Sequence, residues 1–153
     1  MNNKQKGFSL IELLIVVAII LIIAAIAIPN LLRSRIAANE ASAVSSLRTL
    51  NTACITFNST YGQYPALLAD LKSPTSGNPT STAADLVDQV LAAGRKSGYN
   101  FTFTPGTNNA SYSVSAMPIT VNQTGLRGFF TDQSGVIRFN VGVAADVSST
   151  PLQ

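Results

Sequence analysis

Hydrophobic residues are concentrated near the start of this chain, where residues 8–28 are apolar except for Ser9 and Glu12. At about 1.5 Å rise per residue, this run would form about 31 Å of helix, enough to cross a hydrocarbon core of about 30 Å. A buried helix of a small soluble domain needs no such run. The pattern therefore predicts a helix that spans a membrane.

The apolar pattern changes to helical spacing over residues 29–61. Apolar residues recur there at steps of three or four positions, at Val44, Leu47, Leu50, Cys54, Phe57 and Tyr61. Such a stripe is typical of a helix that packs one face on a core, and plain core packing is how we interpret it. Polar residues, Glu40 among them, are expected on the other faces. We therefore expect one long helix over residues 8–61, kinked at Pro29 and ended by Gly62.

Residues 62–98 are expected to form a loop and a short helix. Residues 73–82 are all turn formers and predict a loop. Thr82 is placed to cap a helix over residues 83–93, with Gly94 directly after its end. The expected inner face of this helix consists of Leu86, Val90 and Ala93.

Apolar and polar residues alternate between residues 99 and 140, which is typical of half-buried strands. The expected strands form two hairpins and comprise residues 99–104, 111–116, 126–131 and 136–140. A loose tail, or a short edge strand at most, is expected over residues 141–153. An antiparallel sheet with one polar face needs cover on the other, which the stripe of the long helix can supply. The predicted fold class is α+β: a long N-terminal helix, membrane-spanning in its first half, packed on a four-stranded antiparallel sheet.

Composition argues against catalysis. The 153 residues include no histidine, which excludes a Ser-His triad and a histidine metal site. No phosphate-binding glycine loop is present, and no acidic pair is spaced for acid–base chemistry. Of the formal charge of +3, Lys4 and Lys6 supply two, so no basic patch predicts a nucleic-acid partner. We expect no enzyme activity, no cofactor and no metal.

Three further features have ordinary structural explanations. Cys54 is the single cysteine, which excludes an intramolecular disulfide and favours packing as a small apolar residue. Asp132 lies in the sequence Asp-Gln-Ser-Gly and favours a turn over a calcium site, because hard cations need six or more oxygen ligands. Sequences of the form Asn-x-Ser/Thr are frequent by chance in such strands, and occur at Asn58, Asn100, Asn109 and Asn122.

Glu12 is the unusual residue of the apolar run. A charged side chain costs roughly 2.5–3.5 kcal/mol at the centre of a membrane helix, and less near its end. A position near the headgroups, or in the first turn of the helix, would lower that cost. The other explanation is a cationic partner, and after Lys6 the helix has none before Arg33. A partner from a neighbouring chain is the natural inference.

The sequence K-G-F-S-L-I-E-L-L-I-V-V-A-I-I, which begins at Lys6, resembles the N-terminal signature of type IV pilins and of the related pseudopilins of type II secretion. The resemblance implies that residues 1–7 are a leader, cut between Gly7 and Phe8 by a prepilin peptidase that also methylates the new Phe8 amine. It also matches Glu12 to the family's glutamate, and Pro29 to the proline after the apolar segment. The Phe8 amine of one subunit would then pair with Glu12 of the next and set the stagger of the helices.

By this resemblance, the chain is expected to be a structural subunit of a type IV pilus, a homo-oligomeric helical filament. The implied partners are the peptidase and methyltransferase, an inner-membrane assembly platform and, before assembly, the lipid bilayer. The leader lysines orient the N-terminus to the cytoplasm, and the assembled product is an extracellular pilus or a periplasmic pseudopilus. Alternatives are a pseudopilin of a type II secretion system and a monomeric periplasmic binding module anchored by one helix. An ordinary signal cut after Ala25-Ile26-Ala27 is disfavoured, because the apolar run is long and contains Glu12.

Overall fold

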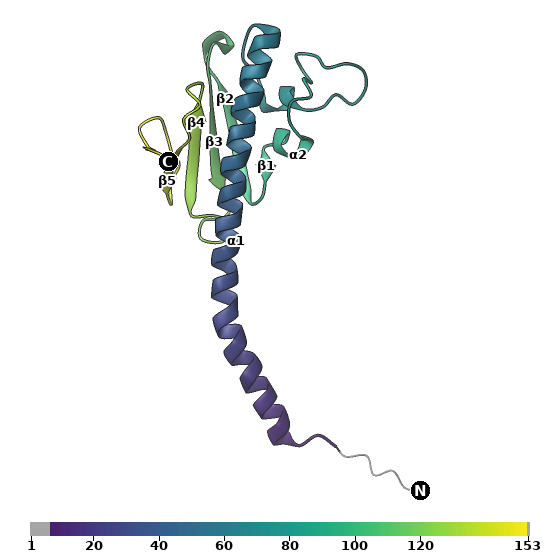
Figure 1. Cartoon of the computed structure of the whole chain (residues 1–153), viewed down its shortest axis with the longest axis vertical. Coiled ribbons are helices and arrows are strands. Elements are labelled where there is room, and N and C mark those ends of the chain that lie inside the picture. Colours follow the sequence, from purple (N-terminus) through teal and green to yellow (C-terminus); the bar gives the residue numbers. More distant parts are fainter. Residues whose placement is uncertain (1–6, 153) are drawn as a thin grey trace. The chain divides into compact units, whose positions relative to one another are not determined.

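The computed structural model describes residues 7–152. The described residues form two compact units, of which the first ends at Ser34 and the second begins at Arg35. One helix, α1 (Leu10–Tyr61), contributes to both units (Figure 1). The long helix that the sequence predicts is therefore confirmed, beginning at Leu10.

The end of α1 is set by a glycine. Gly62 has a φ of +76°, in the left-handed region that glycine adopts without strain, and its N–H donates to the carbonyl of Asn58 at 2.8 Å. Pro29 lies inside α1 and does not end it. Proline has no N–H, so the carbonyl of Ala25 lacks its usual helical donor. The expected kink at Pro29 stays a prediction.

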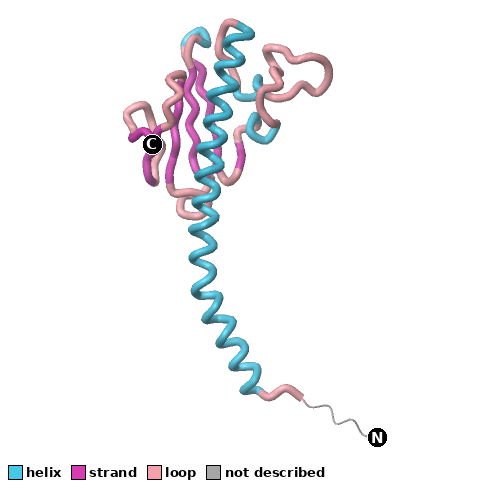
Figure 2. Tube along the Cα trace, viewed as in Figure 1, coloured by secondary structure: helices cyan, strands magenta, loops and turns pink. Residues whose placement is uncertain are grey.

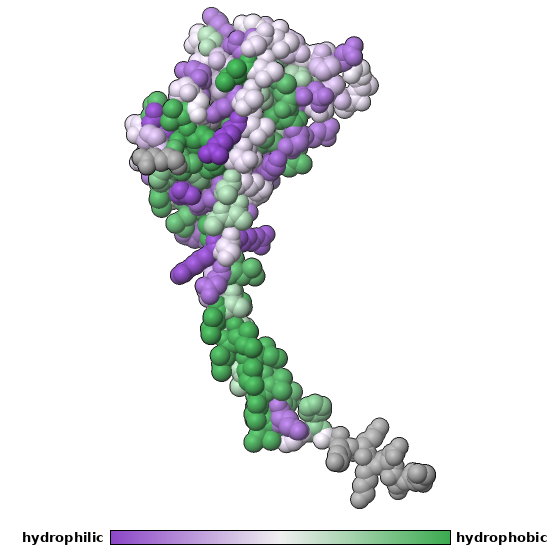
Figure 3. Space-filling model, viewed as in Figure 1, coloured by the Kyte–Doolittle hydropathy of each residue, from purple (hydrophilic) through white to green (hydrophobic). Residues whose placement is uncertain are grey.

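The first unit is an apolar helix whose side chains are exposed along its length. It is long and apolar enough to cross a membrane, and none of its most apolar stretch is buried. Figure 3 shows this stretch as a continuous hydrophobic surface. Large apolar side chains remain more than half exposed, including Phe8, Leu14, Ile20, Ile23 and Ile28. A surface of this kind needs lipid or other protein to cover it.

The second unit contains a six-stranded antiparallel sheet in which the strands follow chain order (Figure 2). Its strands are β1 (Arg95–Lys96), β2 (Tyr99–Pro105), β3 (Tyr112–Pro118), β4 (Arg127–Asp132), β5 (Arg138–Val141) and β6 (Thr150–Pro151). The middle four strands form the two predicted hairpins, so the α+β fold class is confirmed. The two-residue strands β1 and β6 extend the predicted four-stranded sheet at its edges.

The core of this unit lies between the sheet and the second half of α1. The predicted apolar stripe is buried here, with Leu47, Leu50, Cys54 and Phe57 at most 1% exposed. Strand β3 supplies alternate buried residues, from Tyr112 onwards, to the same core. Burying each large apolar side chain contributes roughly 1.5–3 kcal/mol, which is why this packing dominates the stability of the unit.

The short helix after the loop differs from its prediction. Only α2 (Gln89–Ala92) forms, and its cap is Asp88, whose carboxylate accepts the N–H of Leu91. The chain before it cannot be helical because Asp85 has a φ of +57°. In place of helical bonds, residues 84–87 donate backbone hydrogen bonds to residues 70–72, next to the 3-10 helix η1 (Leu68–Leu71).

This change of backbone pairing also changes the buried face. The inner residues are Val87 and Leu91, whereas Val90, predicted to face the core, is 59% exposed. Tertiary hydrogen bonds have therefore overridden a local helical pattern. A second short 3-10 helix, η2 (Thr107–Asn109), lies in the turn between β2 and β3.

Candidate functional site

The predicted cleavage position lies outside the helix. Gly7 and Phe8 precede α1, and the Phe8 side chain is 87% exposed. A β-carbon built on Gly7 would meet no atom within 4 Å. The leader residues Lys4 and Lys6 lie outside the described residues. Exposed backbone outside regular structure is the usual substrate of a protease.

Glu12 is the third residue of α1 and closes its first turn. Its Oε2 accepts the backbone N–H of Ser9 at 2.8 Å, and the carbonyl of Ser9 accepts the N–H of Leu13 at 3.2 Å. A carboxylate that reaches back to the N-terminal end of a helix satisfies a free donor and opposes the positive end of the helix dipole. Glu12 therefore has a local partner within its own chain, which the sequence interpretation gave only as an alternative.

No cation pairs with Glu12 within residues 7–152; the two ion pairs there involve other carboxylates. Only one of its oxygens is used by the bond to Ser9. The pairing of Glu12 with the Phe8 amine of another subunit involves a second chain and stays a prediction.

Glu40 is a residue whose position the sequence interpretation missed. It was expected on an outer face of α1 but is 7% exposed and sits against β4. Its Oε1 accepts the N–H groups of Leu126 and Arg127, and its Oε2 accepts Nε of Arg127 at 2.7 Å. The guanidinium in turn lies 5.4 Å from the ring centre of Phe129 and 5.3 Å from that of Phe139. A signal was available, because Glu40 precedes Val44 and Leu47 at the spacing of the buried stripe.

The charge of Glu40 is stabilised in the folded unit. Burial alone would raise the pKa of this carboxyl group. The hydrogen bonds from Leu126 and Arg127, together with the charge of the guanidinium, outweigh burial and leave the pKa of Glu40 below its ordinary value. Glu40 thus fixes the position of α1 along the sheet at one end of the second unit.

A second set of polar contacts holds α1 against the sheet, further along the helix. Nδ2 of Asn51 donates to Oγ1 of Thr131 at 2.9 Å, and the hydroxyl of Tyr112 donates to Oδ1 of Asn51 at 3.1 Å. All three residues are buried. Burial raises the pKa of the Tyr112 hydroxyl. Because an unpaired polar group is costly in a core, these bonds favour one register of the helix over shifted ones.

The other residues singled out from the sequence have structural roles. Cys54 is fully buried, as predicted, and burial raises the pKa of its thiol to about 12. Asp132 stabilises the predicted turn, since its Oδ1 accepts the N–H of Ser134 at 2.8 Å. Within the described part of the chain, no group of three or more His, Cys, Asp or Glu residues is placed to hold a metal ion.

Comparisons with known proteins agree with the N-terminal motif. Residues 2–28 match a family model described as the prokaryotic N-terminal methylation motif. The type IV major pilin protein PilA of Myxococcus xanthus is 37% identical over 123 residues, covering 71% of this chain and 55% of that protein. The type IV wide pilus major component PilA4 of Thermus thermophilus is 63% identical over 38 residues, covering 25% of this chain and 29% of that protein.

Similarity extends to secretion proteins. The type II secretion system core protein G of Escherichia coli is 32% identical over 72 residues, covering 47% of this chain and 50% of that protein. The chain thus spans about half the length of PilA and of core protein G. No solved structure matches it significantly.

These observations define a class of protein with a methylation motif, an exposed apolar helix and a sheet packed on the second half of that helix. The chain belongs to the family of type IV pilins and type II secretion pseudopilins.

Proposed function

We propose that this protein is a structural subunit of a type IV pilus. It is made as a membrane precursor, cut between Gly7 and Phe8, methylated at the Phe8 amine, and assembled with copies of itself into a filament. The apolar half of α1 forms the filament core, and the sheet of the second unit forms the outer surface. The role is structural and involves no catalysis by this chain.

The observation that carries this proposal is that the matched methylation motif, residues 2–28, includes the exposed apolar first half of α1. Its large side chains gain roughly 1.5–3 kcal/mol each when they are removed from water. In the membrane, lipid supplies the cover. Once the subunit leaves the membrane, equivalent helices of other subunits are the available apolar cover, so the same surface that anchors the precursor also drives assembly.

Glu12 would also determine how neighbouring subunits are positioned in this assembly. Two opposite unit charges at 4 Å attract by about 4 kcal/mol at an effective dielectric of 20. Cleavage creates a positive amine at Phe8, and in a staggered bundle this amine reaches Glu12 of the adjacent subunit. The carboxylate has a second oxygen available beyond the bond to Ser9. Pairing would then fix the axial offset between neighbouring helices.

The proposed route defines the other partners. A prepilin peptidase cuts and methylates the precursor, and an inner-membrane assembly platform adds it to the filament. Before assembly, the chain crosses the inner membrane once, with its N-terminus in the cytoplasm and its second unit outside. This orientation follows from the leader lysines and the apolar run behind them.

Mass spectrometry of the N-terminal peptide, from protein taken out of its native membrane, tests the proposal. We expect a peptide that begins at Phe8 and carries one added methyl group. A start at Ile28 would indicate ordinary secretion without the membrane helix. An intact start at Met1 would indicate an anchored monomer. Either of these two results would contradict the proposal.

A pseudopilin of a type II secretion system is the second candidate, and the similarity to core protein G favours it specifically. Processing at Phe8 is common to both candidates, so the N-terminal peptide does not separate them. Deletion of the gene does: loss of surface filaments with normal enzyme secretion supports the pilus. Loss of secreted enzymes without loss of surface filaments supports the pseudopilus.

A further inference from the structure

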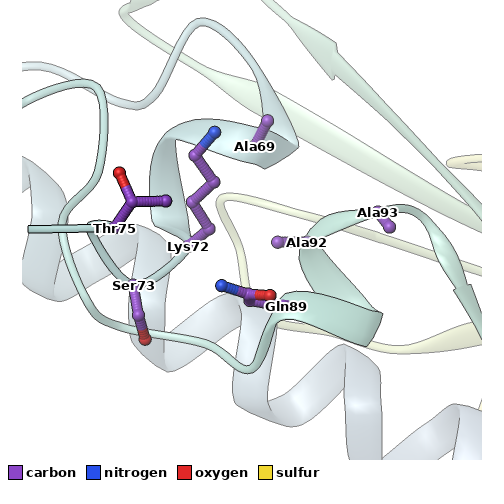
Figure 4. Close-up of a pocket in the computed structure, with 7 residues that line it drawn as sticks. All are labelled: Ala69, Lys72, Ser73, Thr75, Gln89, Ala92 and Ala93. Atoms are coloured by element: carbon purple, nitrogen blue, oxygen red, sulfur yellow. The ribbon is translucent and has the colours of Figure 1, made fainter.

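A pocket of about 390 Å³ lies at the β1 edge of the sheet, between η1 and α2. Its apolar lining consists of the methyl groups of Ala69, Ala92 and Ala93, and Ala92 is nearly buried. Lys72, from the end of η1, and Gln89, from α2, project into the same space (Figure 4). The pocket therefore combines a small apolar surface with one ammonium group.

The ammonium of Lys72 has no acidic partner within residues 7–152. Asp70 is two residues away in the chain, and Asp85 and Asp88 lie in or next to the segment whose backbone pairs with Lys72. Asp70 accepts the N–H of Leu67, and Asp85 accepts the hydroxyl of Ser73. Asp88 pairs with Lys96 at 2.8 Å. Each nearby carboxylate is thus engaged elsewhere, and Lys72 is left for an anion from outside the unit.

The opposite edge of the sheet carries a matching feature. Before β6, residues 146–149 form a tight turn, in which the N–H of Ser149 donates to the carbonyl of Asp146 at 3.1 Å. Oδ1 of Asp146 accepts the N–H and hydroxyl of Ser148 and the hydroxyl of Ser149. These bonds hold the turn rigidly while Val147, at its tip, remains 63% exposed.

The charge of Asp146 is not neutralised within residues 7–152. The nearby guanidinium of Arg138 donates to the carbonyl of Ser149 instead. Oδ1 of Asp146 is used by the bonds within the turn, whereas Oδ2 of Asp146 remains for a further partner. The turn therefore presents a carboxylate beside an exposed valine, the complement of an ammonium beside an alanine-lined pocket.

We propose that the Asp146–Val147 turn of one subunit docks into the Lys72 pocket of the next, with Val147 against the alanine methyl groups and Asp146 paired with Lys72. Because the two surfaces lie at opposite edges of one sheet, a chain does not satisfy them by itself. Complementary surfaces at opposite edges join copies head to tail, and such a contact repeats without closing when the rotation between copies does not close a ring. This inference rests on the proposed filament and assigns one of its lateral contacts.

The test measures sheared surface filaments from cells that assemble the full chain. Lys72→Glu places like charges in the contact, and we expect at least about tenfold fewer filaments. Lys72→Gln and Asp146→Asn should each reduce the yield of filaments roughly two- to fivefold, because each removes one charge of the pair. Asparagine at position 146 keeps a side-chain oxygen as the acceptor that the turn needs. The double variant should be no worse than either single variant, because both remove one interaction. Asp132→Asn is the matched control, since Asp132 caps a similar turn away from this edge; its effect should add to that of Lys72→Gln.

Cross-linking tests the geometry directly. Carbodiimide activates a carboxylate and joins it to an amine in direct contact, with loss of the activated group as a urea, so wild-type filaments should give a ladder of oligomers linked from Lys72 of one subunit to Asp146 of the next. Mass spectrometry should find the Lys72–Asp146 peptide in wild-type filaments and not in those of Lys72→Gln. Wild-type yield from Lys72→Glu, or cross-linked wild-type filaments without the Lys72–Asp146 peptide, would overturn the contact while leaving the pilus proposal intact. A dimer without larger species would show a closed pair and overturn the head-to-tail arrangement. An absence of filaments from the wild-type chain would overturn both proposals.

Discussion

Single carboxylates carry much of the specificity of this molecule, and they do so by bonding to backbone N–H groups. Glu12 closes the first turn of α1, Glu40 holds the start of β4, and Asp146 holds the turn before β6. In each case one oxygen accepts backbone N–H groups, from neighbouring residues for Glu12 and Asp146 and from distant residues for Glu40. The remaining oxygen differs: in Glu40 it pairs with Arg127, whereas in Glu12 and Asp146 we propose that another subunit supplies the cation.

Substitution of Glu12 separates its two roles. Glu12→Leu should still insert into the membrane and be cut, but assemble at least about tenfold less well, because the pairing charge is lost. Glu12→Gln keeps an acceptor for the N–H of Ser9 and loses the charge, so it should assemble equally poorly. The measurement is filament yield relative to processed subunit. Normal yield from Glu12→Gln would assign Glu12 to helix capping alone.

Protonation of Glu40 should destabilise the second unit in acid. Its pKa is lower in the folded chain than the ordinary glutamate value of 4.5, which applies to the unfolded chain. Its contribution to stability is therefore complete above that pH and is lost as the pH falls through the folded pKa. Denaturant midpoints measured across this range should show the loss. Glu40→Gln should remove about 1–3 kcal/mol at neutral pH and flatten this dependence; an unchanged slope would contradict the assignment.

At the scale of elements, α1 serves two different environments with two different patterns. Its first half is apolar on all faces, and its second half has an apolar stripe with polar residues outside. The stripe anchors the sheet, whereas the outer side chains of the same turns contribute little to folding.

A matched pair of truncations measures this difference. Leu50→Ala removes a fully buried side chain and should cost about 2–5 kcal/mol of the free energy of unfolding. Ile55→Ala removes a side chain of the same size on the same helix that is 54% exposed, and should cost less than about 1 kcal/mol. Thermal or denaturant unfolding of the purified chain in detergent checks both values. Similar costs would show that α1 does not pack as described.

Elements with a strong internal pattern could be predicted from the sequence. The stripe of α1 and the alternation in β3 each fix an element through burial, whereas the run before Pro29 stays exposed and predicts a helix by its length and composition. The helix and the strand that these patterns predict are confirmed. The predicted helix over residues 83–93 failed because its backbone bonds to residues 70–72, a pairing between distant segments that leaves no periodic signal. The edge strand β1 is too short to produce a pattern, whereas β6 lies in the segment for which a short edge strand at most was expected.

The candidate site was predictable to a similar extent. The motif around Gly7, Phe8 and Glu12 is local in sequence, and the family comparison supports it. The bond from Glu40 to β4 joins residues that are 86 and 87 positions apart. No spacing rule reports such a contact, although the position of Glu40 on the buried stripe indicates that it must find a partner.

At the scale of the whole molecule, the two units have different requirements for cover. The first unit exposes its apolar side chains and depends on lipid or other subunits. The residues of the hydrophobic core cluster all belong to the second unit, since the first of them along the chain is Ala43. The second unit therefore contains its own core.

A chain that begins at Arg35 should consequently fold and remain soluble without detergent. Its core is intact, and the removed segment supplies no residue to it. Far-UV circular dichroism and a cooperative unfolding transition, with a monomeric elution volume in gel filtration, would confirm this. An aggregated or non-cooperative product would show that the apolar half of α1 is needed for folding as well as for assembly.

Cys54 can report how often the second unit transiently exposes its core to solvent. It is the single cysteine of the chain, it is fully buried, and its thiol has a pKa of about 12, so a solvent-borne thiol reagent reacts when the second unit opens. The rate of labelling then measures how often the native unit exposes its core, without an engineered probe. Applied to free subunits and to filaments in parallel, the same thiol would report how far assembly slows that opening.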